Sequence, residues 1–311
     1  MSSSATAAPS AYRGRFAPSP TGPLHFGSLV AAVGSHLDAR ANRGAWLVRM
    51  EDVDRPRSVP GAADDILRAL EALGMGWDGE VVYQSARDDA YRDALEKLRA
   101  RKLVYPCACS RREIADSAVN GIDGPVYPGT CRLGLQAGRA ARAERVLTRG
   151  AIIEFTDAVQ GRVAQNIERQ IGDFVVKRAD GQYAYQLAVV VDDAAQGITD
   201  IVRGADLQDS TPRQIYLQQL LGYATPRYAH LPVAVNVMGE KLSKQTLAQA
   251  VDITAPVQAL NMALAFLGQE MIGDCAPQDT VAFWKRAIAG WQLKRVPRTR
   301  TLPAVALTDI R

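Results

Sequence analysis

Apolar and polar positions along the chain predict a mixed α/β protein. Residues 28–43 carry apolar side chains at helical spacing, with Ser28 near the expected helix start. Residues 45–50 (AWLVRM) form a short apolar run that is typical of a buried strand. Strand, loop, helix and strand in this order open a parallel sheet, because parallel strands need a crossover connection. Amphipathic helices are expected over residues 61–73 and 86–102.

The pattern changes after residue 105. Residues 106–135 are rich in cysteine, glycine and proline and cannot build a core from their side chains. Residues 151–191 then contain apolar runs (AIIEF, DFVVKR, YAYQLAVVVDD) that predict strands. We therefore expect an insertion over residues 106–190. The α/β core is expected to resume with GITDIVRGAD, a helix near 211–221 and a strand HLPVAVNV, before a helical final stretch.

Composition excludes few classes of protein. The 311 residues are 47% hydrophobic and 23% charged, as in ordinary soluble domains. No run of about 18 apolar residues predicts a membrane span. The first dozen residues are small and polar, which favours a disordered tail over a secretory signal. The net charge of +4 is compatible with a nucleic-acid partner and does not require one.

Two short motifs, far apart in the chain, carry the candidate chemistry. The first, RFAPSPTGPLHFGS, ends at Ser28 and places His25 and Gly27 where a strand gives way to a helix. The second, GEKLSKQ, ends at Gln245. Backbone N–H groups at a helix N-terminus bind phosphate, and lysines neutralise the charge that develops as pyrophosphate leaves. Either motif alone is weak evidence, but their order, with an RMEDVD block between them, makes chance a poor explanation.

With these motifs the chain resembles the class I glutamyl-tRNA synthetases, whose signature pair is written HIGH and KMSKS. It is more similar to their shortened relatives, the glutamyl-queuosine tRNA(Asp) synthetases. The resemblance runs from Arg13 to Gln249 through RFAPSPTGPLHFGS, RMEDVDRPR, AYQLAVVVDD, VRGADL and GEKLSKQ. Ser28 stands where the first motif often ends in His, and Gln245 where the second often ends in Ser. The central motif positions are intact, which indicates a subfamily: His25, Gly27, Lys241, Ser243 and Lys244.

The resemblance implies a Rossmann-like parallel-sheet core with an inserted zinc-containing α+β subdomain. The expected layout is a disordered tail over 1–12, the first half of the catalytic core over 13–105, a zinc-binding, acceptor-type insertion over 106–190, the second half with the lysine loop over 191–250, and a short helical C-terminal region over 251–311.

The resemblance also implies roles for individual residues. His25 and Lys244 are the expected catalytic residues, acting on ATP with Mg²⁺. The expected ATP-binding residues are His25, Gly27, Ser28, Lys241, Ser243 and Lys244. The alternative interpretation is that His25 caps a helix and the lysines are solvated.

The amino-acid site is predicted from charge and from the family. Arg15 suits a substrate side-chain carboxylate, because guanidinium and carboxylate pair through two hydrogen bonds, and Glu51 suits an ammonium group. Two arginines with few nearby acids favour an acidic substrate. The family's glutamate-binding residues correspond to Arg15, Phe16, Ala17, Pro18, Ser19, Glu51, Tyr185 and Arg203. Tyr185 could instead be a core aromatic on a strand, and Arg203 could form a structural salt bridge, for instance to Asp206.

The cysteines indicate a metal site. Cys107 and Cys109 are followed by Cys131 further along the same segment, while Cys275 stands alone. Structural zinc takes four ligands in a tetrahedron, and no histidine lies nearby in the sequence. Tyr127 is our choice for the fourth ligand, and relatives resemble this pattern. Asp123, Glu113 and water remain open, as do reduced thiols without metal. A basic stretch (Arg139, Arg142 and Arg145) either meets tRNA phosphate or forms a solvated helix face.

These observations lead to a functional hypothesis. The chain is expected to activate L-glutamate with ATP, and the resemblance implies transfer to queuosine at the anticodon wobble base of tRNA(Asp). The stretch that follows Gln245, 246–311, is too short for the anticodon-binding region of full-length relatives. The alternatives are a truncated glutamyl-tRNA synthetase that charges a tRNA 3′ end, and a catalytically silent RNA-binding protein. A cytoplasmic monomer with no membrane partner is expected.

Overall fold

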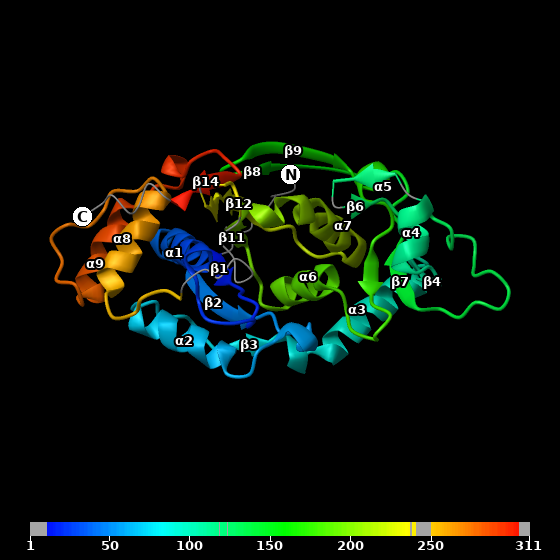
Figure 1. The fold of residues 1–311 in the computed structure, drawn as a ribbon, viewed down its shortest axis with the longest axis horizontal. Helices are drawn as coiled ribbons and strands as arrows, with labels where there is room; N and C mark the ends of the chain where they lie inside the picture. The colour runs from blue at the N-terminus through cyan, green and yellow to red at the C-terminus, as the bar shows by residue number, and fades with distance from the viewer. Residues whose placement is uncertain (1–10, 118, 123, 237, 241–249, 305–311) are drawn as a thin grey trace, which may run out of the picture.

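The computed structural model describes residues 11–304 except 118, 123, 237 and 241–249. The predicted opening of the sheet is confirmed. Strand β1 (Arg13–Phe16) pairs parallel with β2 (Ala45–Met50), and helix α1 (Phe26–Ala41) connects them. Strand β3 (Val82–Tyr83) extends this sheet beyond β2 (Figure 1). The sequence of α1 explains its burial, since small and apolar residues occupy nearly its whole surface.

A second parallel unit lies beside the first. Strand β11 (Asp200–Gly204) pairs with β12 (Arg227–Leu231) across helix α7 (Thr211–Leu221), as expected. The backbone N–H of Thr199 donates to the carbonyl oxygen of Arg13 at 3.0 Å, which joins β11 to β1. The predicted strand HLPVAVNV breaks at Pro232, so β13 (Val233–Val235) follows as a separate strand. Proline lacks the N–H group that a continuous ladder would need.

The remaining elements cover these sheets or form the middle of the chain. The helices are α2 (Ala62–Ala72), α3 (Asp88–Ala100), α4 (Arg111–Ser117), α5 (Ile167–Gln170), α6 (Tyr185–Ala195), α8 (Pro256–Phe266) and α9 (Thr280–Gly290). The strands are β4 (Val104–Cys107), β5 (Asn120–Gly121), β6 (Gly124–Pro125), β7 (Ala143–Val146), β8 (Ile152–Asp157), β9 (Gly161–Asn166), β10 (Val175–Lys177) and β14 (Thr301–Pro303). Short 3-10 helices are η1 (Arg55–Arg57), η2 (Gln84–Ala86), η3 (Ala205–Ser210) and η5 (Leu293–Arg295).

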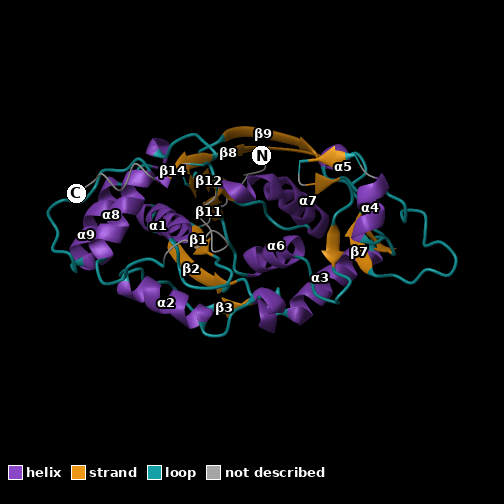
Figure 2. Cartoon of the chain, in the orientation of Figure 1, coloured by secondary structure: helices purple, strands orange, loops and turns teal. Residues whose placement is uncertain are grey.

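The middle of the chain forms an antiparallel layer. Strands β10, β7 and β4 make one sheet, and β8 and β9 make a hairpin that reaches back toward β12. The long axis of the molecule carries α4, β4 and β7 at one end and α8 and α9 at the other (Figures 1 and 2). In the part of the chain that the structure describes, no helix has both the length and the apolar character that a membrane crossing requires.

Two predictions of secondary structure were wrong. The run YAYQLAVVVDD was expected to be a strand, but residues 185–195 form helix α6. Burial explains the difference, because residues 187–193 are all buried, and a fully buried helix shows no periodicity that separates it from a buried strand. The C-terminal stretch is also not purely helical, since β14 pairs parallel with β13.

Candidate active site

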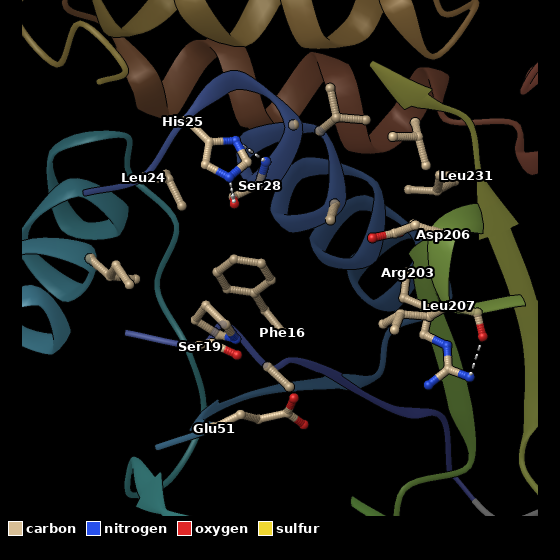
Figure 3. Close-up of a pocket in the computed structure, with 18 of the residues that line it drawn as sticks. Phe16, Ser19, Leu24, His25, Ser28, Glu51, Arg203, Asp206, Leu207 and Leu231 are labelled. Carbon is tan, nitrogen blue, oxygen red and sulfur yellow. Dashed lines mark hydrogen bonds between the residues drawn. The ribbon is translucent and has the colours of Figure 1, made fainter. Parts of the chain in front are cut away.

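A cavity of about 720 Å³ opens where the parallel strands end. It lies at the carboxyl ends of β1, β2 and β11 and at the start of α1, the position at which open α/β sheets bind ligands. Every predicted glutamate-binding residue lines it: residues 15–19, Glu51, Tyr185 and Arg203. So do the predicted ATP-binding residues within the described part, His25, Gly27 and Ser28 (Figure 3). The fold therefore brings the first motif together with segments from the second half of the catalytic core.

His25 both lines the cavity and caps α1. Its Nδ1 accepts a hydrogen bond from the backbone N–H of Ser28 at 3.2 Å, and its Nε2 lies 3.0 Å from Ser28 Oγ. The capping role, which the sequence left as an alternative, is thus what this side chain does here. The start of α1 faces the cavity with no acidic residue in its first turn, so its positive end is available to an anion.

The segments that flank the lysine loop are anchored by hydrogen bonds. Lys241, Ser243 and Lys244 lie outside the described residues. Before the loop, Asn236 Oδ1 accepts from the backbone N–H groups of Met238 and Glu240, both at 2.9 Å. After the loop, Ala250 bridges to His25 at the cavity, and the adjoining N–H at position 251 donates to the carbonyl oxygen of residue 24 at 2.9 Å.

A buried ionic network lies beside the cavity, which two of its members, Arg15 and Glu51, line. Arg15 Nε lies 3.1 Å from Asp193 Oδ1, and Arg49 Nη1 lies 2.9 Å from the same oxygen. Arg49 Nη2 also lies 3.2 Å from Glu51 Oε1. Burial opposes ionisation of Asp193, but Arg15 and Arg49 outweigh it and lower the pKa of this carboxyl. Burial raises the pKa of Glu51 despite both arginines. The network holds Arg15 and Glu51 in fixed positions beside the cavity.

Sequence reasoning missed Arg49 and Asp193. The prediction that few acids lie near Arg15 and Arg203 was incomplete, because Asp193 pairs with Arg15. In the sequence, Asp193 is marked only as one of two aspartates at the end of the apolar run YAYQLAVVVDD. A buried aspartate needs a charged partner, but the sequence of this run does not indicate which residue that partner is.

Tyr185 and Arg203 reach the cavity from different elements. Tyr185 is the first residue of α6, not a strand residue, and burial raises its pKa to about 12, so it is a neutral phenol. Arg203 is buried near the end of β11. Its described hydrogen bonds go to neutral groups: His230 Nε2 at 3.1 Å, the carbonyl oxygen of Leu207 at 3.4 Å, and Thr211 Oγ1 and Gln214 Oε1 at 2.8 Å.

The predicted metal ligands lie together at the far end of the molecule. The sulfurs of Cys107, Cys109 and Cys131 all lie within 4.8 Å of one another, with Cys109 and Cys131 3.6 Å apart. Tyr127 Oη lies 3.4 Å from Cys107 Sγ and 3.7 Å from Cys109 Sγ. Zinc bonds of about 2.3 Å place tetrahedral sulfurs about 3.8 Å apart, so these four side chains fit a zinc ion.

Neighbouring side chains narrow the choice of a fourth ligand for the cluster. Arg145 lies on β7 and is buried, and its Nε–H donates a hydrogen bond to Cys107 Sγ at 3.3 Å. The solvated helix face, one of the two interpretations of this basic stretch, is therefore wrong for Arg145, which is a buried strand residue. Burial raises the pKa of Tyr127, so only a bound cation would favour its phenolate. Glu113 is occupied by the N–H of Ser110 and by Arg139, and Asp123 lies outside the described residues.

A parallel sheet whose strand ends and first helix start open onto a charged cavity is the arrangement found in nucleotide-binding α/β enzymes. A family model, "tRNA synthetases class I (E and Q), catalytic domain", matches residues 11–267. The chain belongs to this family, which confirms the resemblance and the fold class predicted from the motifs.

Close relatives and solved structures agree with this assignment. The chain is 61% identical to the glutamyl-Q tRNA(Asp) synthetase of Aromatoleum aromaticum, over 92% of this chain and 91% of that one. It is 62% identical to the protein of the same name from Dechloromonas aromatica, over 93% and 97%. The crystal structure of glutamate-tRNA synthetase from Elizabethkingia anophelis superimposes with a TM-score of 0.77 at 25% identity, over 94% of this chain and 68% of that one.

Proposed function

We propose that this protein activates L-glutamate with ATP and transfers it to queuosine in tRNA(Asp). The observation that carries the proposal is that the N-terminus of α1 lines the same cavity as Arg15, Glu51 and Arg203. Such a cavity suits a polyphosphate beside an acidic amino acid. The relatives named glutamyl-Q tRNA(Asp) synthetase support the acceptor, because they match over nearly their whole length.

The reaction proceeds in two steps. The α-carboxylate of glutamate attacks the α-phosphorus of ATP, the bond to the bridging oxygen breaks, and pyrophosphate leaves with the electron pair. A hydroxyl of the queuosine cyclopentenediol then attacks the carbonyl carbon of glutamyl-adenylate. An ester forms, AMP leaves, and the hydroxyl proton passes to solvent. The protein forms no covalent bond, so catalysis consists of positioning and charge stabilisation.

Roles in this proposal fall to residues that line the cavity and to the lysine loop (residues 241–249). The start of α1, with His25, Gly27 and Ser28, holds the phosphates, and Lys241, Ser243 and Lys244 neutralise pyrophosphate, with Mg²⁺ accompanying ATP. Glu51 holds the substrate ammonium group. The substrate side-chain carboxylate binds the guanidinium groups of Arg15 and Arg203, and Tyr185 is a neutral hydrogen-bond partner.

The remaining assignments concern the rest of the molecule. Cys107, Cys109, Tyr127 and Cys131 hold one structural zinc ion, which crosslinks segments that lack an apolar core of their own. The insertion over 106–190 contacts the tRNA. The enzyme acts as a monomer in the cytoplasm.

A labelling experiment tests the proposal. The protein is incubated with labelled glutamate, ATP and tRNA(Asp), with and without queuosine. Label should attach only to tRNA that carries queuosine, and it should remain after removal of the 3′-terminal adenosine. The structural likeness to glutamate-tRNA synthetase favours one rival, charging of a tRNA 3′ end. Loss of label after removal of the 3′-terminal adenosine would decide for that rival. If neither tRNA is labelled, both the proposal and the rival are refuted.

A further inference from the structure

A buried chain of side chains connects the β8–β9 hairpin to Arg203. Asp157, at the end of β8, places Oδ2 2.6 Å from Nδ1 of His230 on β12. His230 Nε2 in turn lies 3.1 Å from Nε of Arg203. Asp157 is 2% exposed, His230 0% and Arg203 5%, so water does not compete for these hydrogen bonds. The orientation of the cavity arginine is thus linked to the turn of a distant hairpin.

The hydrogen-bonding partners on either side of His230, Asp157 and Arg203, determine the protonation and the tautomer of its imidazole. An arginine Nε–H can only donate, and an ionised carboxylate can only accept. His230 must therefore be neutral, with its proton on Nδ1 and its lone pair on Nε2. Burial lowers the pKa of His230, in agreement with a neutral ring. Thr211 Oγ1, 3.1 Å from Nε2, lies on the same side of the ring as Arg203.

Asp157 is itself firmly held. Its Oδ1 accepts from the backbone N–H groups of Val159 at 3.0 Å, Gln160 at 2.8 Å and His230 at 3.1 Å. This leaves Oδ2 for the imidazole. Burial opposes ionisation, but the hydrogen bonds from His230 and from the backbone outweigh it and lower the pKa of this carboxyl. The carboxylate is therefore a fixed acceptor that selects one tautomer of His230.

These hydrogen bonds from Asp157 through His230 fix which nitrogen of the Arg203 guanidinium group stays without a partner. Nε of Arg203 is taken by His230, and Nη2 by Thr211, Gln214 and Leu207. Nη1 has no hydrogen-bond partner among the residues that the structure describes. Figure 3 shows it on the side of Phe16 and Glu51, which line the cavity with Arg203. A buried cationic donor without a partner is costly unless a ligand supplies the acceptor.

We propose that Asp157 and His230 are positioning residues that hold the guanidinium group of Arg203 in the wall of the cavity, with Nη1 on the side of Phe16 and Glu51, and that they thereby set the affinity for the acidic group of the amino-acid substrate. Taking glutamate as that substrate rests on the function proposed above. Neither Asp157 nor His230 lines the cavity, so both act only through Arg203.

Asp157→Asn is the sharpest perturbation, because it keeps the size of the side chain. The amide oxygen still accepts from the three backbone N–H groups, but the amide NH₂ replaces Oδ2 and donates to His230 Nδ1. The imidazole proton must then move to Nε2, where it faces the Nε–H of Arg203, so a donor meets a donor. Loss of a hydrogen bond to a charged group predicts a KM for glutamate about 10- to 100-fold higher in pyrophosphate exchange. The KM for ATP should be unchanged.

Further variants separate positioning from support of the fold. Gln160→Ala removes hydrogen bonds from the same turn to the carbonyl oxygens of His230 and Thr299, but leaves the imidazole chain intact. It should leave the KM for glutamate unchanged. His230→Gln should retain near-normal affinity, because its amide oxygen can accept from Arg203, whereas His230→Phe should behave like Asp157→Asn.

¹⁵N-histidine NMR reads the tautomer directly, since the chain has only three histidines. The wild-type His230 proton should be on Nδ1 and should move to Nε2 in Asp157→Asn. The proposal would be overturned by any of three results. These are a proton on Nε2 of His230 in the wild type, an unchanged KM for glutamate in Asp157→Asn, and a KM for glutamate that rises as much in Gln160→Ala as in Asp157→Asn. If the wild type shows no glutamate-dependent exchange, the proposed function fails instead, and the tautomer still decides whether Asp157 and His230 hold Arg203.

Discussion

Replacing His36 by leucine should remove a large part of the acid sensitivity of this fold. His36 lies on α1, 4% exposed, with its ring centroid 4.9 Å from that of Trp46 and 4.6 Å from that of Trp284. Its Nδ1 has no hydrogen-bond partner within the described ranges. Burial lowers the pKa of His36 to about 3, and the charge of Arg40 adds to this effect.

The sign of the pH dependence follows from the two states. An unfolded histidine binds a proton near pH 6.5, whereas folded His36 binds it only near pH 3. Between these values the unfolded state holds one more proton, so the free energy of unfolding falls as the pH falls. The loss is about 1.4 kcal/mol per pH unit, or about 3 kcal/mol from pH 6.5 to pH 4. Leucine, of similar volume, should change the stability at pH 7 by less than about 1.5 kcal/mol.

Urea unfolding at pH 7, 6, 5 and 4, followed by tryptophan fluorescence, measures the effect. The stability of His36→Leu relative to wild type should rise at each step below pH 6.5, because all other groups titrate alike in both proteins. Ser35→Ala is the matched control, since it removes the 3.0 Å hydrogen bond from Trp46 Nε1 without removing a titrating group. Its difference from wild type should be the same at every pH. Parallel pH profiles for wild type and His36→Leu would refute the reasoning.

Three further predictions concern the site and the metal. Protein purified without added zinc should contain about one equivalent by metal analysis. Tyr127→Phe should lose the zinc faster to a chelator because one ligand is gone, but should still bind it because three thiolates remain; an unchanged rate of loss would place the fourth ligand elsewhere. Asp193→Asn should lower the free energy of unfolding by about 3–5 kcal/mol in urea melts, because Arg15 and Arg49 stay buried without their anion; a change below about 1 kcal/mol, on the order of an exposed pair, would contradict this. Lys244→Ala should slow glutamate-dependent pyrophosphate exchange about a hundredfold, and an unchanged rate would remove the lysine loop from the reaction.

The sequence predicted best what is local. The crossover from β1 through α1 to β2 follows from apolar spacing within one short stretch, from Arg13 to Met50. The cysteine cluster follows from three soft ligands and one tyrosine in a short segment without a core. Helix α6 was not predicted, because its surroundings bury it on all sides and leave its apolar run without a period.

The site was predicted only where a motif names its residues. Arg15, His25 and Glu51 were found through motif blocks, and the structure places them at one cavity. The contact from Arg49 to Asp193 spans 144 residues, and only the folded chain shows that the two meet. The roles of the cavity residues remain predictions for the experiments above.

The pairing of β13 with β14 has a practical consequence for work with this protein. Strand β14 (Thr301–Pro303) is the described neighbour of β13, and Val233 and Ala234 on β13 also line the cavity. Deleting the chain from Thr301 onward would leave β13 with an open edge, which can pair with another molecule and favour aggregation.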